Sequence, residues 1–426
     1  MSFFIRKQRR NNETRLSSRT VPKKRKIEKA EEPEEITSEE DEEEEEILSN
    51  DDESEDETEQ EARLRIAKRE IANLREKLEQ TNEIVDDEVL GDALKHSVLA
   101  NQGKVIRKHV AQQFSNNIQQ PIVACSSAKA LKSPLTCMVV DENGMVYTSS
   151  KNGCVIKWEA TRRICKFLKP SPVYCLSLGK TVLGATTSSN IQLLSLKNLD
   201  VLHKLNTRDG CNVSIMNDTL FSTHKDRTVK VWNISEHAYV ESLFGHQDTP
   251  TDVDCVEGED LRAVSCGGFD KTIRVWKINE ESQLVFNWDQ QIIDVVKVIN
   301  SVLFVAGTCS GAIGLFSFNR KKPLFVVNQA HGVDSNGVPR WITALGVLRN
   351  SDLMASGSDS GDVHIWRIGV KNLDLINTVQ VGDSVVITLQ FIENPVVTLF
   401  AALGVEHANG RWGGKIAKKN SVVKII

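Results

Sequence analysis

The stretch that decides the fold runs from Phe244 to Trp276 and reads FGHQDTPTDVDCVEGEDLRAVSCGGFDKTIRVW. It opens with a Gly-His dipeptide and continues with two strand-like runs, Thr251–Val256 and Leu261–Ser265. A tight turn that contains Asp270 then leads into a third strand, which ends at the tryptophan. A Gly-His pair, an aspartate in the last turn and a terminal tryptophan within about 40–45 residues indicate one blade of a β-propeller.

The end of this third strand recurs through the chain and defines seven units. Four copies keep the terminal tryptophan, and three degenerate copies carry Leu194, Phe316 or Ile426 in its place. The spacing therefore predicts an all-β fold, a seven-bladed WD40 β-propeller over residues 119–426. The clear copies are Lys151–Trp158, His224–Trp232, Phe269–Trp276 and Ser360–Trp366, and the degenerate copies are Ser188–Leu194, Ser310–Phe316 and Asn420–Ile426.

The two ends of the repeat region are expected to meet. The last unit ends with its third strand at Ile426, so it lacks an outer strand of its own. We expect Pro121–Cys125, just before the first blade, to supply that strand, because pairing the two ends in one sheet removes an open edge. Long intervals between the last units predict insertions on the faces of the propeller at Ala330–Trp341 and Gly404–Asn420.

Four polar side chains of the central blade are spaced like the hydrogen-bonded tetrad of WD40 proteins. This resemblance implies that Trp276 donates to Ser265 and that Ser265 contacts His246. The histidine would in turn contact Asp270. Because a buried histidine and a buried aspartate must be paired to be tolerated, we interpret this set as a structural tetrad and not as a catalytic triad.

Charge is segregated along the chain, whose formal net charge is -5. Residues 1–30 carry eleven Lys/Arg and two Asp/Glu, whereas residues 31–61 carry twenty Asp/Glu and no Lys/Arg. Dense like charges with little apolar surface cannot offset chain entropy, so residues 1–60 are expected to be a disordered, basic-then-acidic tail. Its basic cluster is typical of a nuclear import signal, with a solvated tail that touches RNA as the alternative. The cluster consists of Lys23, Lys24, Arg25 and Lys26.

Residues 61–118 are expected to form a short helical segment between the tail and the propeller. Apolar residues recur there at spacings of three and four, which places them on one face of a helix. The stripe covers only about two heptads, so the helix is expected to dock onto the propeller or onto a partner. The residues of the stripe are Leu64, Ala67, Ile71, Leu74 and Leu78.

The sequence lacks the common motifs of catalytic, phosphate-binding and zinc-binding sites. It contains no phosphate-binding glycine loop, no HExxH, no zinc-ligand spacing and no GxSxG. The nine histidines are scattered, and the nine cysteines form no CxxC pair, which favours reduced thiols. No apolar run is long enough to span a bilayer. We therefore expect a non-enzymatic protein without catalytic residues, metal, cofactor, small-molecule substrate or membrane contact.

Basic loops that contain aromatic residues are the best candidates for function. Cations bind RNA phosphates, and an exposed tryptophan can stack on a base. The alternative is an ordinary loop in which Trp412 packs against its own blade. The candidate RNA-binding residues are Arg411, Trp412, Lys415, Lys418 and Lys419, then a second basic tip at Arg320, Lys321 and Lys322, and finally Arg340 at the end of the other insertion.

Several strings of the sequence resemble the WD40 protein family of the U3 small nucleolar ribonucleoprotein particle, the U3 snoRNP. They are Val240–Asp248, Val275–Ile278, Glu281–Phe286, Lys321–Leu324, Ala330–Gly332, Trp341–Ile342 and Gly410–Trp412.

This resemblance implies a protein of the nucleus and nucleolus that binds the box B/C region of U3 snoRNA together with a small kink-turn-binding snoRNP protein. Other snoRNP and small-subunit processome proteins would be its further partners. Its role would be processing of pre-rRNA to 18S rRNA in ribosome biogenesis. The residues themselves leave an alternative open, a nuclear WD40 adaptor of a chromatin or ubiquitin-ligase complex that binds only proteins.

Overall fold

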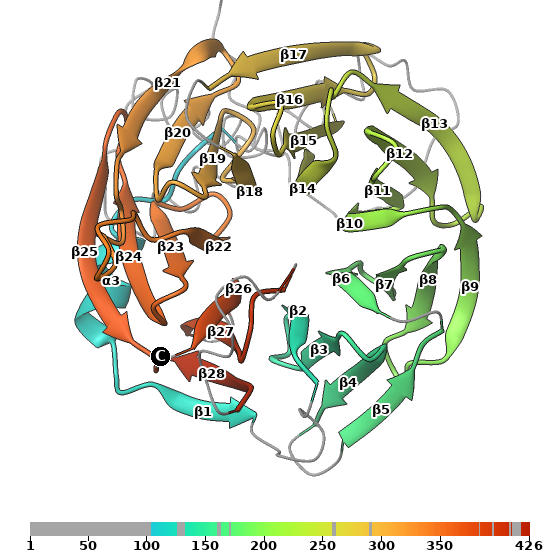
Figure 1. Cartoon of the computed structure of the whole chain (residues 1–426), viewed down its shortest axis with the longest axis horizontal. Coiled ribbons are helices and arrows are strands. Elements are labelled where there is room, and N and C mark those ends of the chain that lie inside the picture. Colours follow the sequence, from blue (N-terminus) through green and yellow to red (C-terminus); the bar gives the residue numbers. More distant parts are fainter. Residues whose placement is uncertain are drawn as a thin grey trace, which may run out of the picture. The chain divides into compact units, whose positions relative to one another are not determined.

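The computed structural model describes residues 104–125, 133–159, 163–169, 172–257, 261–288, 292–382, 384–393, 396–408, 410 and 419–426. Their strands form seven antiparallel sheets of four strands each. The sheets are arranged as the blades of a propeller around a central channel (Figure 1). Within these described ranges, no helix is long and apolar enough to cross a membrane.

The predicted seven-bladed propeller is thus confirmed, and each blade runs from the channel outward in strand order. Blade 1 contains β2 (Leu135–Val140), β3 (Val146–Ser150), β4 (Cys154–Trp158) and β5 (Arg163–Phe167). Blade 2 contains β6 (Val173–Leu178), β7 (Val182–Thr187), β8 (Asn190–Ser195) and β9 (Val201–Asn206). Blade 3 contains β10 (Gly210–Met216), β11 (Thr219–His224), β12 (Thr228–Asn233) and β13 (Ala238–Phe244). Blade 4 contains β14 (Pro250–Glu257), β15 (Leu261–Gly267), β16 (Thr272–Lys277) and β17 (Ser282–Asn287). Blade 5 contains β18 (Ile293–Val298), β19 (Leu303–Thr308), β20 (Ile313–Ser317) and β21 (Arg320–Val327). Blade 6 contains β22 (Ile342–Val347), β23 (Leu353–Ser358), β24 (Asp362–Ile368) and β25 (Leu373–Gln380).

Blade 7 closes the ring with strands from both ends of the described chain. It contains β26 (Val385–Glu393), β27 (Val397–Gly404) and β28 (Ser421–Ile425), and its outer strand is β1 (Ile122–Cys125). In the pairing of these last two strands, Ile122 lies opposite Lys424 and Val123 lies opposite Val423. The closing strand expected from the sequence is therefore present, and it covers the edge that β28 would otherwise expose.

The hydrophobic core lies mainly between neighbouring blades. The first strand of each blade contacts the first strands of the two blades beside it. Between blades 4 and 5, the buried ring of Phe286 meets that of Phe304 edge-on at 5.3 Å. The ring of Phe316 then stacks on Phe304 at 5.2 Å. Each blade thus completes the core of its neighbours, so the ring is stable as a whole.

The tetrad residues of blade 4 are connected by three short hydrogen bonds. The Trp276 indole donates to the Ser265 hydroxyl at 2.8 Å, and Nε2 of His246 lies 2.8 Å from the same oxygen. Nδ1 of His246 lies 2.7 Å from a carboxylate oxygen of Asp270. The chain of contacts ties strands β15 and β16 to the connection that enters the blade.

Blades 3 and 6 build related networks, blade 3 from a histidine of its second strand and blade 6 from a histidine on the connection that enters the blade. In blade 3, His224 at the end of β11 contacts the Ser222 hydroxyl at 2.8 Å, and Trp232 donates to that hydroxyl. In blade 6, His331 contacts the Ser356 hydroxyl at 2.8 Å. Burial, together with the neighbouring His364, lowers the pKa of His331 to about 3, so this ring is neutral in the folded protein.

One described helix, α3 (Val110–Asn117), attaches the segment before the propeller to blades 6 and 7. Asp352, between β22 and β23, accepts hydrogen bonds from the backbone N–H groups of His109 and Ala111 at 2.9 and 3.0 Å. A carboxylate at a helix N-terminus satisfies free N–H groups and complements the helix dipole. Phe114 packs edge-on against Phe391 of β26, with ring centroids 5.6 Å apart.

Several expectations fall on residues outside the described ranges. They are the charged tail over residues 1–60, its basic cluster at Lys23–Lys26 and the apolar stripe from Leu64 to Leu78. Of the expected helical segment 61–118, only residues 104–118 are described, and α3 lies within them.

Replacing Ser265 by alanine tests the tetrad. The substitution leaves the buried Trp276 N–H and Nε2 of His246 without their shared partner, so we expect the free energy of unfolding to fall by about 2–4 kcal/mol. Urea unfolding monitored by circular dichroism measures the loss. Ser282→Ala, at an exposed serine of β17, is the matched control and is expected to change little. Equal losses in the two variants would contradict the structural role of the tetrad.

Candidate nucleic-acid interface

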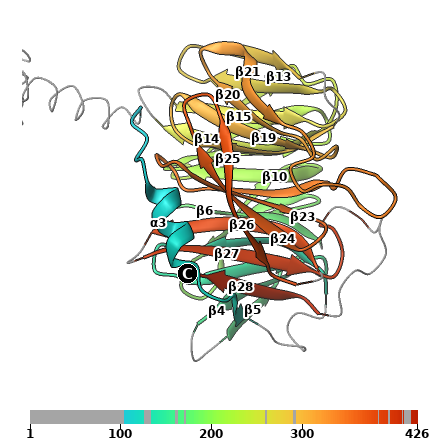
Figure 2. The same cartoon turned by 90° about the vertical axis from the view of Figure 1, so that its left-hand side faces the viewer.

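The connections of the propeller lie on two opposite faces. Because consecutive strands are antiparallel, turns between second and third strands share one face with the connections from blade to blade. We call this the upper face; it includes the turn 268–271 and the connections 328–341 and 405–420. The lower face carries the other turns, such as 318–319, and also α3. Figure 2 shows α3 at the left and the connection between β21 and β22 at the right.

The two long connections of the upper face meet directly. Trp341, at the end of the first connection, stacks on His407 of the second, with ring centroids 4.3 Å apart and an interplanar angle of 20°. The Trp341 indole N–H also donates to the carboxylate of Asp294 at the start of β18. The two insertions that the sequence predicts separately therefore form one structure over blades 5, 6 and 7.

Blade 1 holds the same structure from the other side. Lys151, in the turn between β3 and β4, donates to the Glu406 carboxylate at 3.0 Å and to the His407 carbonyl oxygen at 2.9 Å. The Glu406 side chain is only 2% exposed, so this ion pair is largely shielded from water. Contacts thus cross the seam between the first and last blades and fix the start of connection 405–420.

Asn420 fixes the far end of this connection. Its side-chain oxygen accepts from the Val405 N–H at 2.9 Å, and its side-chain N–H donates to the Ser133 carbonyl oxygen at 3.0 Å. Lys419, beside it, is exposed. The other predicted RNA-binding residues of the connection, Arg411, Trp412, Lys415 and Lys418, lie outside the described ranges. Both described ends of this basic segment lie on the upper face.

The remaining candidate residues divide between the two faces. Arg340 precedes Trp341 on the upper face, where its guanidinium lies 3.6 Å from the Asp359 carboxylate and its side chain stays 30% exposed. Arg320, Lys321 and Lys322 are exposed, but they begin β21. Ser317 pairs with Arg320 and also with Leu303, which places this basic tip on the lower face. The structure therefore does not bring the two basic groups into one surface.

Burial sets the protonation of the groups beneath the long connections. It lowers the pKa of His407 to about 4, with the nearby Lys151 acting in the same direction, so the stacked imidazole is neutral. Burial raises the pKa of Asp294 to about 7, although the indole hydrogen bond opposes the rise. The upper mouth of the channel thus contains a carboxyl group that titrates near neutral pH.

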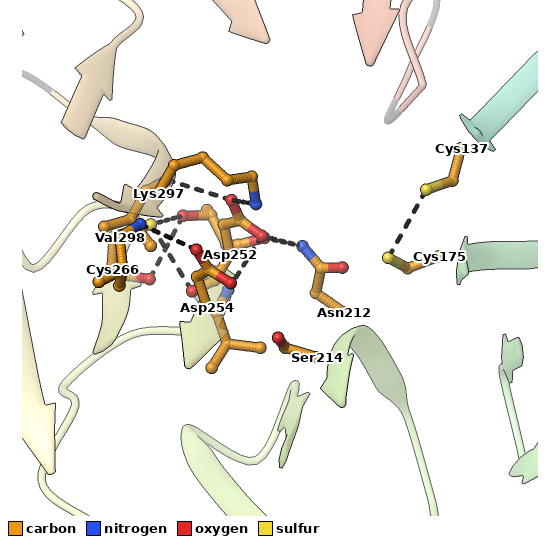
Figure 3. A network of polar contacts seen from close by, with 12 residues as sticks. Cys137, Cys175, Asn212, Ser214, Asp252, Asp254, Cys266, Lys297 and Val298 are labelled. Atoms are coloured by element: carbon orange, nitrogen blue, oxygen red, sulfur yellow. Dashed lines mark hydrogen bonds and ion pairs between the residues drawn. The ribbon is translucent and has the colours of Figure 1, made fainter. Parts of the chain in front are cut away.

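The central channel is lined by charged groups that we did not single out from the sequence. It has a volume of about 1320 Å³. Asp252 pairs with Lys297 at 3.2 Å (Figure 3). Asp254 pairs with Arg349 at 3.0 Å. Burial by itself would lower the pKa of Lys297, but the two carboxylates raise it, so the lysine stays charged. The alternation Asp-Val-Asp within β14 was the available signal, since alternate residues of a strand share a face.

Within the described part of the chain, no group of three or more His, Cys, Asp or Glu side chains is placed to hold a metal ion. The polar groups described above make hydrogen bonds and ion pairs within the protein. Their arrangement suits the presentation of loops to a macromolecule.

The fold and its loop-built face define a WD40-repeat propeller protein. The family model for the WD domain, G-beta repeat, matches residues 238–277. Human U3 small nucleolar RNA-interacting protein 2 is 34% identical over 421 residues, which cover 86% of this chain and 82% of the human protein. Ribosomal RNA-processing protein 9 of Saccharomyces cerevisiae is 26% identical over 262 residues, which cover 46% of this chain and 45% of the yeast protein.

A solved structure agrees with these relatives. The crystal structure of RRP9 WD40 repeats matches with a TM-score of 0.67 and 32% sequence identity, and the match covers 72% of this chain and 99% of that one. The chain belongs to the family of U3 snoRNP-associated WD-repeat proteins.

Replacing Asp294 by asparagine tests the buried carboxyl group at the channel mouth. Its pKa of about 7 exceeds the ordinary value of about 3.9, so the folded state holds a proton that the unfolded state releases. The parent therefore loses stability as pH rises from about 4 to 7, whereas asparagine accepts the indole hydrogen bond without ionising. We expect the variant to be more stable at pH 8, by up to about 4 kcal/mol, with an advantage that shrinks toward pH 4.

Urea unfolding across this pH range measures the difference between the variant and the parent. Asp374→Asn is the control. Arg367 lowers the pKa of that exposed carboxylate, so its replacement is not expected to stabilise the protein at pH 8. A pH-independent difference for Asp294→Asn, or a variant less stable than the parent at pH 8, would contradict this assignment.

Proposed function

We propose that the protein is a non-enzymatic subunit of the U3 snoRNP that binds U3 snoRNA and supports the processing of pre-rRNA to 18S rRNA. Membership of the family supports this role, because the human relative is named for its interaction with U3 snoRNA and the yeast relative for rRNA processing. The observation that carries the proposal is the junction of the two long upper-face connections, where Trp341 stacks on His407.

The junction gives the basic connection a fixed base on which to meet RNA. Both ends of connection 405–420 are held, one by Lys151 and the other by Asn420. Fixing a loop before binding lowers the entropy lost when its side chains contact a ligand. In our proposal Arg411, Lys415 and Lys418 contact phosphates, and the ring of Trp412 stacks on an unpaired base.

Arg340 extends the proposed contact along the first connection. Its partner Asp359 is 3.6 Å away, a weak ion pair that a phosphate can replace. Lys419 lies exposed beside the held end of the basic connection. The RNA surface therefore follows the upper rim over blades 6 and 7.

The assembled particle adds partners to this interface. We propose that the bound element is the box B/C region of U3 snoRNA and that a small kink-turn-binding snoRNP protein occupies the same RNA. The protein would act in the nucleolus, reached through the import signal at Lys23, Lys24, Arg25 and Lys26. Other snoRNP and processome proteins would contact the remaining surfaces.

Removing three cations from the basic connection tests the RNA surface. We expect the triple change of Arg411, Lys415 and Lys418 to Ala to weaken binding to a U3 box B/C fragment by about 10–100-fold and to reduce the slope of log K against log salt by about 2. Fluorescence anisotropy over a salt series measures both. The melting temperature is expected to stay close to that of the parent, because the changes leave the seven cores intact.

The matched control changes three cations of the lower face, Arg320, Lys321 and Lys322, to Ala. Because these residues lie on the opposite face, we expect RNA affinity to fall less than threefold. Equal losses in the two triple variants would show a nonspecific charge effect and would contradict an upper-face site.

Recovery of RNA with the protein from cells tests the particle itself. U3 snoRNA is expected to co-purify with the tagged chain well above the level found with an unrelated nuclear propeller. Equal recovery, with weak and salt-insensitive RNA binding in vitro, would favour the alternative of a protein-binding nuclear adaptor.

A further inference from the structure

Two thiols from neighbouring blades meet in the wall of the central channel. Sγ of Cys137, on β2, lies 3.8 Å from Sγ of Cys175, on β6 (Figure 3). Both side chains line the channel of about 1320 Å³. The two residues are 38 positions apart in the chain and belong to no sequence motif, so only the packing of blade 1 against blade 2 reveals the pair.

The repeat explains why the pair exists. Each cysteine is the third residue of the inner strand of its blade. The third residues of the next two inner strands, Asn212 and Asp252, also contact each other, with a hydrogen bond of 2.5 Å. At this level of the channel, two pairs of neighbouring blades thus bring equivalent side chains into contact, and in one of them these are the two thiols.

We propose that Cys137 and Cys175 form a peroxide-sensitive thiol pair whose oxidation to a disulfide links blade 1 covalently to blade 2. A disulfide bond is about 2.05 Å long, so the sulfur atoms need to approach by about 1.8 Å. In the channel wall Cys175 is partly exposed and Cys137 is 8% exposed, and the channel is the route by which a small oxidant would reach them.

The local environment favours Cys137 as the attacking group. Contact with the Cys175 sulfur is the main cause that lowers the pKa of Cys137, and the positive charge of Lys297 acts in the same direction. The pKa of Cys175 is raised, so this residue keeps its proton until the second step. By contrast, burial raises the pKa of Cys154 to about 11 and that of Cys255 to about 12.

The reaction balances with hydrogen peroxide as the oxidant. The Cys137 thiolate attacks one peroxide oxygen, the O–O bond breaks, and the leaving hydroxide takes a proton to become water. Cys137 is then a sulfenic acid. The Cys175 sulfur attacks the Cys137 sulfur, the S–O bond breaks, and the departing hydroxide takes the Cys175 proton as a second water. Two thiols are oxidised and one peroxide is reduced.

Peptide mapping of the full chain after a brief treatment with a small excess of hydrogen peroxide tests the proposal. Mass spectrometry without reductant is expected to find the peptide that joins Cys137 to Cys175 as the main cross-linked product, reversible by dithiothreitol. Oxidation is expected to raise the melting temperature by about 3–8 °C, because the bond closes a long loop of the unfolded chain.

Three variants separate the steps. In Cys175→Ser the reaction is expected to stop at a Cys137 sulfenic acid, trapped by dimedone. In Cys137→Ser, Cys175 is expected to stay reduced and the melting temperature to stay unchanged by peroxide. Cys154→Ser, at a buried cysteine of blade 1, is the matched control and is expected to form the same disulfide as the parent.

The peptide map of the parent protein tests the proposal by itself, even if a variant folds poorly. Oxidation of the exposed Cys165 while Cys137 and Cys175 both stay reduced would overturn the proposal. Cross-links from Cys137 spread over several other cysteines would overturn it as well, because they would report unfolding and not a built pair.

Discussion

The pairing of β1 with β28 is the constraint on which the propeller depends. Each blade packs mainly against its two neighbours, so the ring has one seam, and at this seam the first and last parts of the repeat region share a sheet. Without β1, blade 7 would expose the edge of β28. The same strand couples blade 7 to blade 1, because β2 of blade 1 is the next strand in the chain. Within this closed ring, buried polar networks stabilise the individual blades 3, 4 and 6.

Closure also creates the candidate interface. The Lys151 contact with Glu406 joins blade 1 to the last long connection, and the stacking of Trp341 on His407 joins that connection to the one before blade 6. These contacts cross between elements that are far apart in the chain. In our proposal, the two held ends of connection 405–420 distinguish this basic loop from a free basic tail, because they lower the entropy lost when the loop binds RNA. The ion pairs of the channel wall, with Asp252 and Asp254 on one strand, keep the inner strands beneath this face in register.

The repeat made the fold predictable from the sequence, whereas the site depended on contacts across the ring. Terminal tryptophans and their degenerate substitutes identified all seven blades, and the spacing of His246 from Asp270 matched a known tetrad. The histidines of the related networks, His224 and His331, come from positions that this spacing does not cover. The stack of Trp341 on His407 and the thiol pair of Cys137 and Cys175 follow from ring geometry. For the same reason, only the strand register shows that Arg320 and Lys419 lie on opposite faces.

Residue-level mapping of crosslinks between the full chain and a U3 box B/C fragment tests the central claim most directly. In our proposal, RNA follows the upper rim of blades 6 and 7, over the two connections joined at Trp341. The account predicts crosslinks within residues 405–420 and around Arg340, with few in the lower-face turn that precedes Lys321. Crosslinks concentrated on that lower turn, or spread evenly over all exposed cations of the propeller, would contradict it.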